Sequence, residues 1–328
     1  MMGILFKQIV KNCLFAILKF IRFFTYSFDK KISLYLSKLN WSSKIYNKSL
    51  EITTTVGCAM MCSYCPQENY KKNGKSYPRV LTFAIFKKAL DNVNKDVKIH
   101  WTGFSEPLHC EEFSKMSDYA YNKGHVQHIS TTMYGRKNSK EYVSTSNKFE
   151  SIVLHLPDKD MLMHLKVNDE YIDYLEKTLR FQSKKIKAKK FLIMVIGDDF
   201  EERVKKLLAK LVEEKIISES QVEIRKHLVS RAGQIENREG FRQNKIEQFE
   251  KNKKNLFYCG YGRLNKSVML TDGSLAICCN DYSIEHNVGS LVDESLDQLY
   301  QHKKLFSDDD FIRGDKELCK KCEFYKFI

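Results

Sequence analysis

Three cysteines lie close together in the stretch CAMMCSYC, and thiolates are ligands for zinc and for iron–sulfur clusters. Cys58, Cys62 and Cys65 could bind three irons of a [4Fe–4S] cluster and leave the fourth iron open to an external ligand. A zinc site would need a fourth ligand to complete its tetrahedron, and the nearest candidates, His100 and Cys110, lie in other segments. The spacing therefore favours a cluster with one open position.

A second group of cysteines lies near the end of the chain: Cys259, Cys278, Cys319 and Cys322. Four thiolates are enough to ligate one [4Fe–4S] cluster completely, and Cys279 could replace Cys278. A structural zinc knuckle is the alternative for this group. A secreted disulfide scaffold fits poorly, because such scaffolds are short and evenly bridged, whereas residues 111–258 contain no cysteine. The clustering favours metal or iron–sulfur ligation in a reducing cytoplasm.

Short apolar runs alternate with helical segments from about residue 49, and these elements must position the cysteines. The expected strands are 50–57, 97–103, 126–133, 151–157, 190–197 and 221–229. The expected helices are 81–93, 111–122, 169–181 and 199–214. Thr82 could cap the first helix, with Phe86, Ala89 and Leu90 facing inward. Such alternation predicts an α/β fold with a parallel sheet, closed or partly closed into a barrel.

The first cysteine group follows the first expected strand, where the loops of an α/β barrel carry the chemistry. After about residue 245 the alternation stops, and the stretch KSVMLTDGSLAICCND predicts a hairpin that turns at Asp272 and Gly273. We therefore expect three parts: a basic amphipathic segment, a barrel and a small cysteine-rich domain, over residues 1–48, 49–245 and 246–328.

The spacing C-x3-C-x2-C after the first strand of an α/β barrel resembles that of the radical S-adenosylmethionine (SAM) superfamily. The resemblance extends over about residues 50 to 325 and implies a partial (β/α)6 barrel. It also implies that the open iron binds the amino and carboxylate groups of SAM. Electron transfer then cleaves the sulfonium to a 5′-deoxyadenosyl radical, which abstracts hydrogen from the substrate.

The same resemblance implies a set of SAM contacts: Tyr64, Gly103, Ser105, Glu106, Thr131 and Arg231. Tyr64 matches an aromatic residue that often precedes the third cysteine. The stretch TGFSEP resembles the family's glycine-glycine-glutamate-proline segment, with Ser105 in place of a usual glycine. Thr131 lies near the end of the third expected strand and Arg231 follows the last one, and the resemblance implies that these regions suit the ribose and the carboxylate of SAM. An arginine after a strand is otherwise a common surface ion-pair residue.

The spacing Cys259-x18-Cys278-x40-Cys319-x2-Cys322, with Gly273 five residues before Cys278, resembles the auxiliary-cluster domain called SPASM, or twitch in its short form. Only six residues follow Cys322, which matches the twitch form. The resemblance implies a second [4Fe–4S] cluster whose irons are all ligated by protein.

A fully ligated cluster has no open iron for substrate and suits electron transfer. Hydrogen abstraction from an alcohol carbon, loss of a proton and transfer of one electron would give a two-electron oxidation to a carbonyl. His155, at the end of a strand, and Arg231 are candidates for removing the proton. The alternatives are a peptide- or protein-modifying radical SAM enzyme and, in another class, a non-catalytic iron–sulfur or zinc protein that binds nucleic acid. A flavodoxin- or ferredoxin-type protein is the expected electron donor.

The net charge of +14 is concentrated at the amino terminus, where residues 1–50 carry nine Lys and Arg against one Asp. Residues 4–24 form a helical pattern with a narrow cationic stripe and a broad apolar face, too interrupted by charge to span a bilayer or to act as a signal peptide. This pattern suits an anionic membrane surface, although a helix packed on the protein's own core would look similar.

We therefore expect a cytoplasmic protein that is attached peripherally to the inner face of the cell membrane through residues 1–40. A sugar or a lipid-linked glycan is the expected substrate. Nucleic acid is not expected as a partner, because the lysine-rich stretch 183–190 lacks interleaved aromatic residues.

Overall fold

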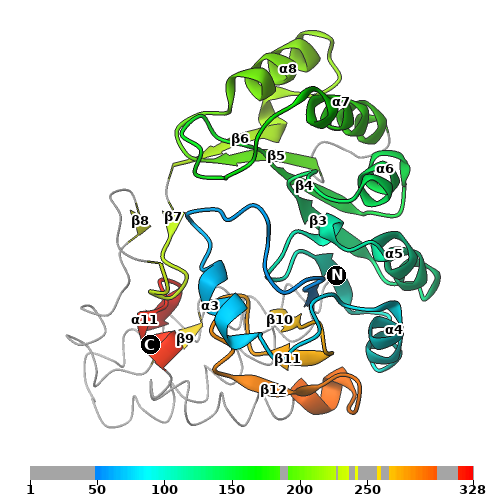
Figure 1. Ribbon diagram of the computed structural model, residues 1–328, viewed down its shortest axis with the longest axis vertical. Helices are drawn as coiled ribbons and strands as arrows, with labels where there is room; N and C mark the ends of the chain where they lie inside the picture. Colours follow the sequence, from blue (N-terminus) through cyan, green and yellow to red (C-terminus); the bar gives the residue numbers. More distant parts are fainter. Residues whose placement is uncertain are drawn as a thin grey trace, which may run out of the picture. The chain divides into compact units, whose positions relative to one another are not determined.

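The computed structural model describes a barrel sheet with its outer helices and a carboxyl-terminal extension (Figure 1). The described residues are 49–184, 191–226, 228–235, 241–242, 257–259, 266–300 and 317–327. All of them belong to the unit that comprises residues 47–327. The predicted amphipathic segment 1–48 lies outside the described residues and stays a prediction.

Six parallel strands form the barrel sheet and lie side by side in chain order. They are β1 (Ser49–Ile52), β2 (Lys98–Trp101), β3 (Gln127–Thr131), β4 (Ser151–His155), β5 (Phe191–Ile196) and β6 (Val222–Arg225). The register pairs Ile52 with Trp101 and Trp101 with Ile129, all of them buried. The prediction of a partial (β/α)6 barrel is confirmed, although every strand ends before its predicted run does, β5 by one residue and β1 by five.

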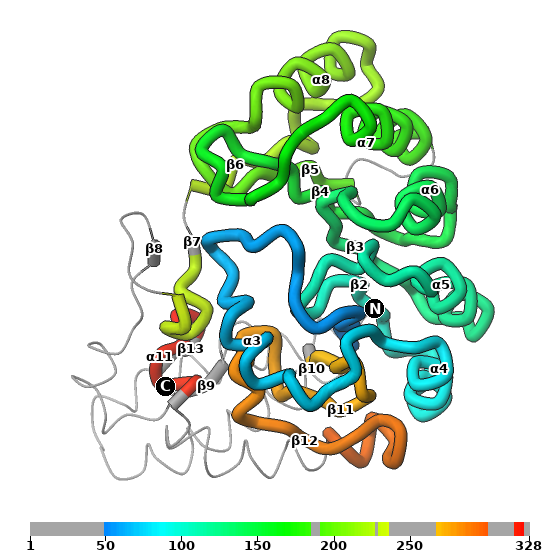
Figure 2. The backbone as a smooth tube through the Cα atoms, in the orientation of Figure 1, coloured from blue at the N-terminus to red at the C-terminus, as the bar shows by residue number. Residues whose placement is uncertain are grey.

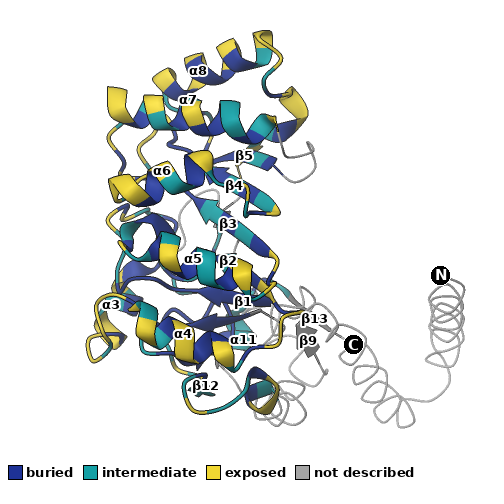
Figure 3. Ribbon diagram, turned by 90° about the vertical axis from the view of Figure 1, so that its right-hand side faces the viewer, coloured by how far each residue is buried: buried dark blue, intermediate teal, exposed yellow. Residues whose placement is uncertain are grey.

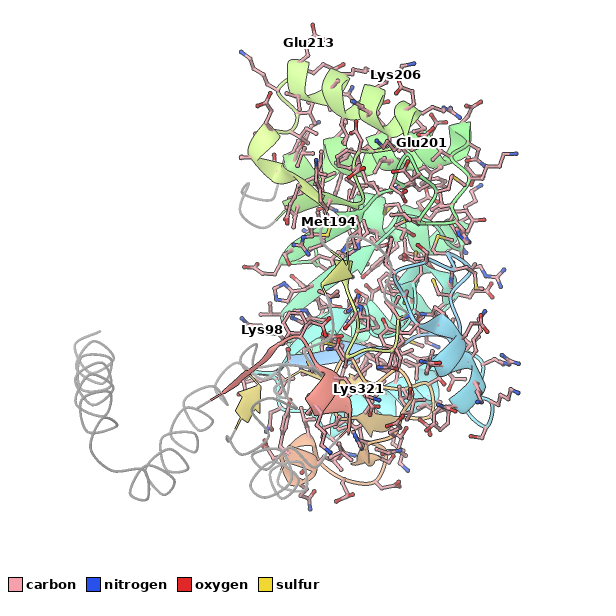
Figure 4. The ribbon with its side chains drawn as sticks, turned by 90° about the vertical axis from the view of Figure 1, so that its left-hand side faces the viewer. Lys98, Met194, Glu201, Lys206, Glu213 and Lys321 are labelled. Carbon is pink, nitrogen blue, oxygen red and sulfur yellow. The ribbon has the colours of Figure 1, made fainter. Side chains whose placement is uncertain are left out.

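Five helices lie along one face of this sheet, and the loop after β1 lies on the other side (Figures 1 and 2). They are α4 (Phe83–Asp91), α5 (Phe113–Asn122), α6 (Lys137–Thr145), α7 (Asp169–Ser183) and α8 (Glu202–Glu213). Each buries a stripe and exposes the opposite side, as the alternating colours of Figure 3 show. In α8 the stripe contains Leu207 and Leu211, whereas Lys206 and Glu213 point outward (Figure 4).

Among the described helices, α6, the short α3 (Gln67–Asn73) and α11 (Glu317–Lys321) were not expected from the sequence. The stretch KNSKEYVST of α6 has Val143 as its only large apolar residue, so it lacks the repeating apolar positions that indicate a helix. By contrast, the predicted start of α4 is confirmed. The Thr82 side chain accepts a hydrogen bond from the backbone N–H of Ile85 at 3.3 Å, and Phe86, Ala89 and Leu90 are buried.

The carboxyl-terminal segment extends the barrel sheet. Strand β10 (Lys266–Met269) lies parallel to β1, and β11 (Ser274–Ala276) and β12 (Asn287–Ser290) follow it in antiparallel order. The predicted hairpin is present, and Gly273 takes a φ of +88° in its turn. The sequence predicts a separate domain from residue 246, but the sheet continues across that boundary because β10 pairs with β1.

The remaining elements are short. They are β7 (Leu228–Val229), β8 (Phe241–Arg242), β9 (Phe257–Cys259), α11 (Glu317–Lys321), β13 (Tyr325–Phe327) and two 3-10 turns, Pro107–His109 and Glu219–Gln221. Strand β13 pairs with β9, and β7 pairs with β8. Among the residues that the structure describes, no helix is long and apolar enough to cross a bilayer.

Candidate functional site

A cavity of about 310 Å³ lies at the carboxyl ends of the first barrel strands and is bordered by both cysteine-bearing regions. Ten predicted residues line it: Cys58, Cys62, Tyr64, Cys65, Gly103, Ser105, Glu106, Thr131, His155 and Arg231. They come from the loops after β1 and β2, from the ends of β3 and β4, and from the segment after β7. The structure thus brings together every residue that the sequence assigned to SAM, to proton removal and to the first cluster.

The three thiols of the first group lie close enough to influence one another. Burial, and then the neighbouring Cys65 and Cys58, raise the pKa of the Cys62 thiol to about 12. Burial raises the pKa of the Cys58 thiol to about 11. Because thiolates are the ligand form, any metal that binds here must displace these protons.

Gly103 allows the loop after β2 to lie directly against the end of β1. Its φ is +48°, and a Cβ at this position would lie 2.4 Å from the Thr53 hydroxyl oxygen and 2.7 Å from the Ile52 carbonyl oxygen. A side chain would push the two loops apart, so the match of this residue to the family's segment has a clear steric reason.

Ser105 stands where the family has a glycine, and its hydroxyl holds the cysteine loop in place. The Ser105 Oγ accepts hydrogen bonds from the backbone N–H groups of Thr54 and Thr55, at 3.2 and 3.1 Å. The departure from the family pattern therefore adds a connection between the loops after β1 and β2.

Glu106 borders the cavity, and its carboxylate is hydrogen-bonded to the end of β3. One oxygen accepts from the Thr131 hydroxyl at 2.6 Å, and the other accepts from the backbone N–H and the hydroxyl of Thr132, at 2.7 and 2.8 Å. Burial raises the pKa of Glu106, and these hydrogen bonds oppose that shift. The residue holds the ends of β2 and β3 together.

His155 lines the cavity from the end of β4, and Arg231 lines it from the segment after β7. Burial, and then the charges of Arg225 and Arg231, lower the pKa of His155 to about 4. The imidazole is therefore neutral at pH 7 and able to accept a proton. Arg231 has a φ of +51°, and its backbone N–H donates to the carboxylate of Glu323 at 3.1 Å.

Most of the second cysteine group gathers around the segment that follows β11. Cys278 is buried, and burial, with the nearby Cys279, Asp281 and Cys322, raises its pKa. Asn280 donates to the Cys322 sulfur at 3.6 Å, and the backbone N–H of Cys322 donates to the carbonyl of Cys319. Cys259 pairs with Tyr325 in the β9–β13 ladder, while its side chain lies outside the described part.

The sequence matches no protein-family model and no curated protein. The fold, in contrast, matches solved structures. A structure of anSMEcpe with bound AdoMet (SAM) and Cp18Cys peptide is 16% identical, with a TM-score of 0.50 over 84% of this chain and 86% of that one. It belongs to the radical SAM enzymes with SPASM or twitch domains. This chain has the radical SAM fold.

Two further structures are similar at lower TM-scores. BtrN in complex with AdoMet and 2-DOIA is 13% identical, with a TM-score of 0.49 over 84% of this chain and 93% of that one. Streptococcus suis SuiB bound to the precursor peptide SuiA is 14% identical, with a TM-score of 0.49 over 91% of this chain and 76% of that one.

The cysteine loop of this radical SAM fold fits an iron–sulfur cluster by its donor set. Three thiols of one loop border one cavity, which is a donor set suited to three irons of a [4Fe–4S] cluster. In the described ranges, no three His, Cys, Asp or Glu side chains form a ready site for a single metal ion.

Several cavity residues were not found from the sequence. Glu51 on β1 is the register partner of His100 on β2, and both line the cavity; the sequence named His100 only as a possible zinc ligand. Gln67 and Tyr282 border the cavity beside Cys65. A carboxylate and an imidazole inside otherwise apolar strands are a signal that could have indicated the first pair. Tyr282 is far from the cysteine loop in sequence, and no spacing rule connects them.

Proposed function

We propose that the protein is a radical SAM enzyme with two [4Fe–4S] clusters, one on Cys58, Cys62 and Cys65 and an auxiliary one on Cys259, Cys278, Cys319 and Cys322. When bound, the first cluster would supply the electron that cleaves SAM to a 5′-deoxyadenosyl radical, and the second would accept an electron from the substrate. The observation that supports this best is the single cavity lined by the three thiols and by every residue expected to contact SAM.

Different residues of the cavity would bind the cluster and different parts of SAM. The three thiols are expected to hold the cluster, and Gly103 lets the loop after β2 approach it closely. Tyr64 is buried beside Cys62, in a place suited to the adenine ring. The Arg231 guanidinium brings a positive charge to the cavity, which favours a carboxylate there.

We further propose that the reaction oxidises an alcohol to a carbonyl. With SAM and the clusters bound, the 5′-deoxyadenosyl radical would take a hydrogen atom from the substrate carbon, and the auxiliary cluster would accept one electron. The neutral imidazole of His155 would accept the proton of the hydroxyl. These losses amount to a two-electron oxidation. The lowered pKa of His155 supports its role, since a base must be unprotonated before the reaction.

The basic amphipathic pattern of residues 1–40 favours a substrate at a membrane surface, such as a sugar on a lipid carrier. We therefore propose a sugar or a lipid-linked glycan over a peptide. Reconstituted enzyme should produce 5′-deoxyadenosine above background with lipid-linked sugars but not with peptides of similar size. Substrate-dependent product with the peptides alone would assign the enzyme to the peptide-modifying class.

The decisive experiment counts iron after anaerobic reconstitution with iron and sulfide. The wild-type protein should hold about eight irons and cleave SAM reductively, because each cluster contains four. The triple variant Cys58→Ala/Cys62→Ala/Cys65→Ala should hold about four irons and lose all cleavage. Cys110→Ala is the matched control, since this buried thiol lies outside the cavity lining. SAM cleavage by the triple variant would refute the proposal.

A further inference from the structure

Tyr282 joins the two cysteine groups. It follows Cys278 by four residues, yet its hydroxyl lies 3.5 Å from the sulfur of Cys65, and the Cys65 thiol donates a hydrogen bond to it. The ring is 5% exposed, and its centroid lies 4.3 Å from that of Phe104 in the loop after β2. A phenol in this position has little freedom to turn away from the sulfur.

The direction of this hydrogen bond must reverse when Cys65 binds iron. A ligating cysteine is a thiolate and has no proton, whereas a tyrosine hydroxyl is both a donor and an acceptor. The amide of Gln67 approaches the same sulfur from within the cysteine loop, with 3.4 Å between Nε2 and Sγ, and also donates to the Phe104 carbonyl at 2.6 Å. The sulfur of Cys65 would thus receive hydrogen bonds from the phenol and from the amide.

The place of Tyr282 depends on the segment that carries Cys278. The backbone N–H of Asp281 donates to the Cys278 carbonyl, and the Asp281 carboxylate accepts from the backbone N–H groups of Glu285 and His286, both at 3.0 Å. Gln234 donates to the carbonyl of Asn280. These bonds fix the chain on both sides of the tyrosine.

We infer that Tyr282 is a positioning residue that raises the reduction potential of the cluster on the first cysteine group by donating a hydrogen bond to Cys65. Reduction adds negative charge to a cluster and its sulfur ligands, so a donor at the sulfur stabilises the reduced state more than the oxidised one. Because the segment after Cys278 places the phenol, the folding of the second cysteine region sets a property of the first cluster. The inference rests on the proposed function.

The test is a redox titration followed by electron paramagnetic resonance, on reconstituted wild-type protein and Tyr282→Phe. The first cluster is recognised by the change of its signal when SAM is added. Loss of one charge-assisted hydrogen bond should lower the equilibrium constant for its reduction about tenfold, which is a shift of about 59 mV to more negative potential for one electron. The auxiliary cluster should keep its potential.

Tyr77→Phe is the matched control, because Tyr77 packs on the same apolar cluster as Tyr282 and its hydroxyl is hydrogen-bonded to Ser274 and Asn287. Equal potentials in wild type and Tyr282→Phe would overturn the inference. If Tyr282→Phe takes up no iron, 3-fluorotyrosine at position 282 replaces it, since this residue keeps the shape and is a stronger donor. A shift to more positive potential supports the inference, and an unchanged potential overturns it. A wild-type protein without SAM-sensitive iron would instead count against the proposed function.

Discussion

The two cysteine groups are built in opposite ways. Cys58, Cys62 and Cys65 come from one loop and border a cavity. The second group comes from chain positions more than sixty residues apart, and backbone pairing between β9 and β13 brings its first and last parts together. The three thiols of the first group are half-buried at the cavity, whereas in the second group Cys278 is buried and Cys319 and Cys322 are half-buried.

The difference shows how the spacing of the cysteines along the chain determines whether their site borders a cavity. A short loop at the end of a strand can present three ligands to a cavity without help from other segments. Four ligands gathered from distant positions surround their site with the chain that carries them. The first arrangement suits binding and chemistry, and the second suits transfer of electrons without contact with substrate.

The largest expected effect comes from removing a cysteine of the second group. Cys278→Ala should hold about four irons in place of about eight and should still cleave SAM when reduced without substrate, because the first group is intact. Oxidised product should fall below detection, since the electron acceptor is lost. Iron analysis and chromatography of 5′-deoxyadenosine and product measure the two effects.

Cys279→Ala is the control for this variant. Cys279 is the neighbour of Cys278 but lines the cavity and packs on the apolar cluster of Val268 and Tyr282. It should keep about eight irons. If Cys279→Ala loses the auxiliary iron and Cys278→Ala keeps it, the assignment of the two thiols must be exchanged.

Much of the first cysteine site could be predicted from the sequence, because it depends on the local spacing of its cysteines. The loop of Cys58, Cys62 and Cys65 needs only a strand end to present it, and the alternation of apolar runs indicated that strand. Gly103 and Glu106 were found through the resemblance of the stretch TGFSEP to the radical SAM family's segment, and each of them lies in the loop after β2. The predicted residues therefore meet in one cavity.

The rest depends on long-range pairing that no local pattern encodes. Strand β10 lies beside β1 although more than two hundred residues separate them, so the predicted domain boundary at 245 does not divide the sheet. The same pairing brings Tyr282 to Cys65. Glu323 follows Cys322 directly and would be expected from the sequence to be a surface charge. It is buried instead and accepts hydrogen bonds from the segment of Arg231.

Glu323 also gives a way to test whether the second cysteine region holds Arg231 in the cavity. Its carboxylate accepts from the backbone N–H groups of Arg231 and Ala232, both at 3.1 Å, and from the Ser230 hydroxyl at 3.3 Å. Glu323→Gln places an NH₂ group against one of these donors and should lower the free energy of unfolding by about 2 kcal/mol. Urea unfolding measures it.

Arg231 should lose its place in the cavity at the same time, so that the KM for SAM rises while the iron content stays the same. Glu213→Gln is the matched control, because this carboxylate is exposed at the end of α8 (Figure 4). A Glu323→Gln protein as stable as the control, with an unchanged KM, would show that the two regions are independent.

A smaller effect on stability is expected from removing the hydrogen bonds between the loop after β1 and the loop after β2. Ser105→Ala removes the acceptor of the backbone N–H groups of Thr54 and Thr55, and should lower the free energy of unfolding by about 1.5 kcal/mol. Ser105→Thr keeps the hydroxyl and is the control. Equal unfolding curves for wild type and Ser105→Ala would mean that water replaces the serine hydroxyl at no cost.

The smallest expected effect is a pH dependence of the free energy of unfolding that arises from His155 in the cavity. The pKa of His155 is lowered to about 4 by burial and by the charges of Arg225 and Arg231, whereas an unfolded histidine has a pKa of about 6.5. Between these values the unfolded chain binds more protons than the folded one, so the free energy of unfolding falls as pH decreases from 6.5 to 4, and the contribution of His155 is fully present above 6.5.

His155→Gln removes this pH dependence. Between pH 7.5 and 5.0 the wild-type protein should lose about 1 kcal/mol more than the variant, after allowance for the exposure of the imidazole to the cavity. Denaturant unfolding at the two pH values measures the difference, and parallel losses in both proteins would mean that folding does not lower the pKa of His155.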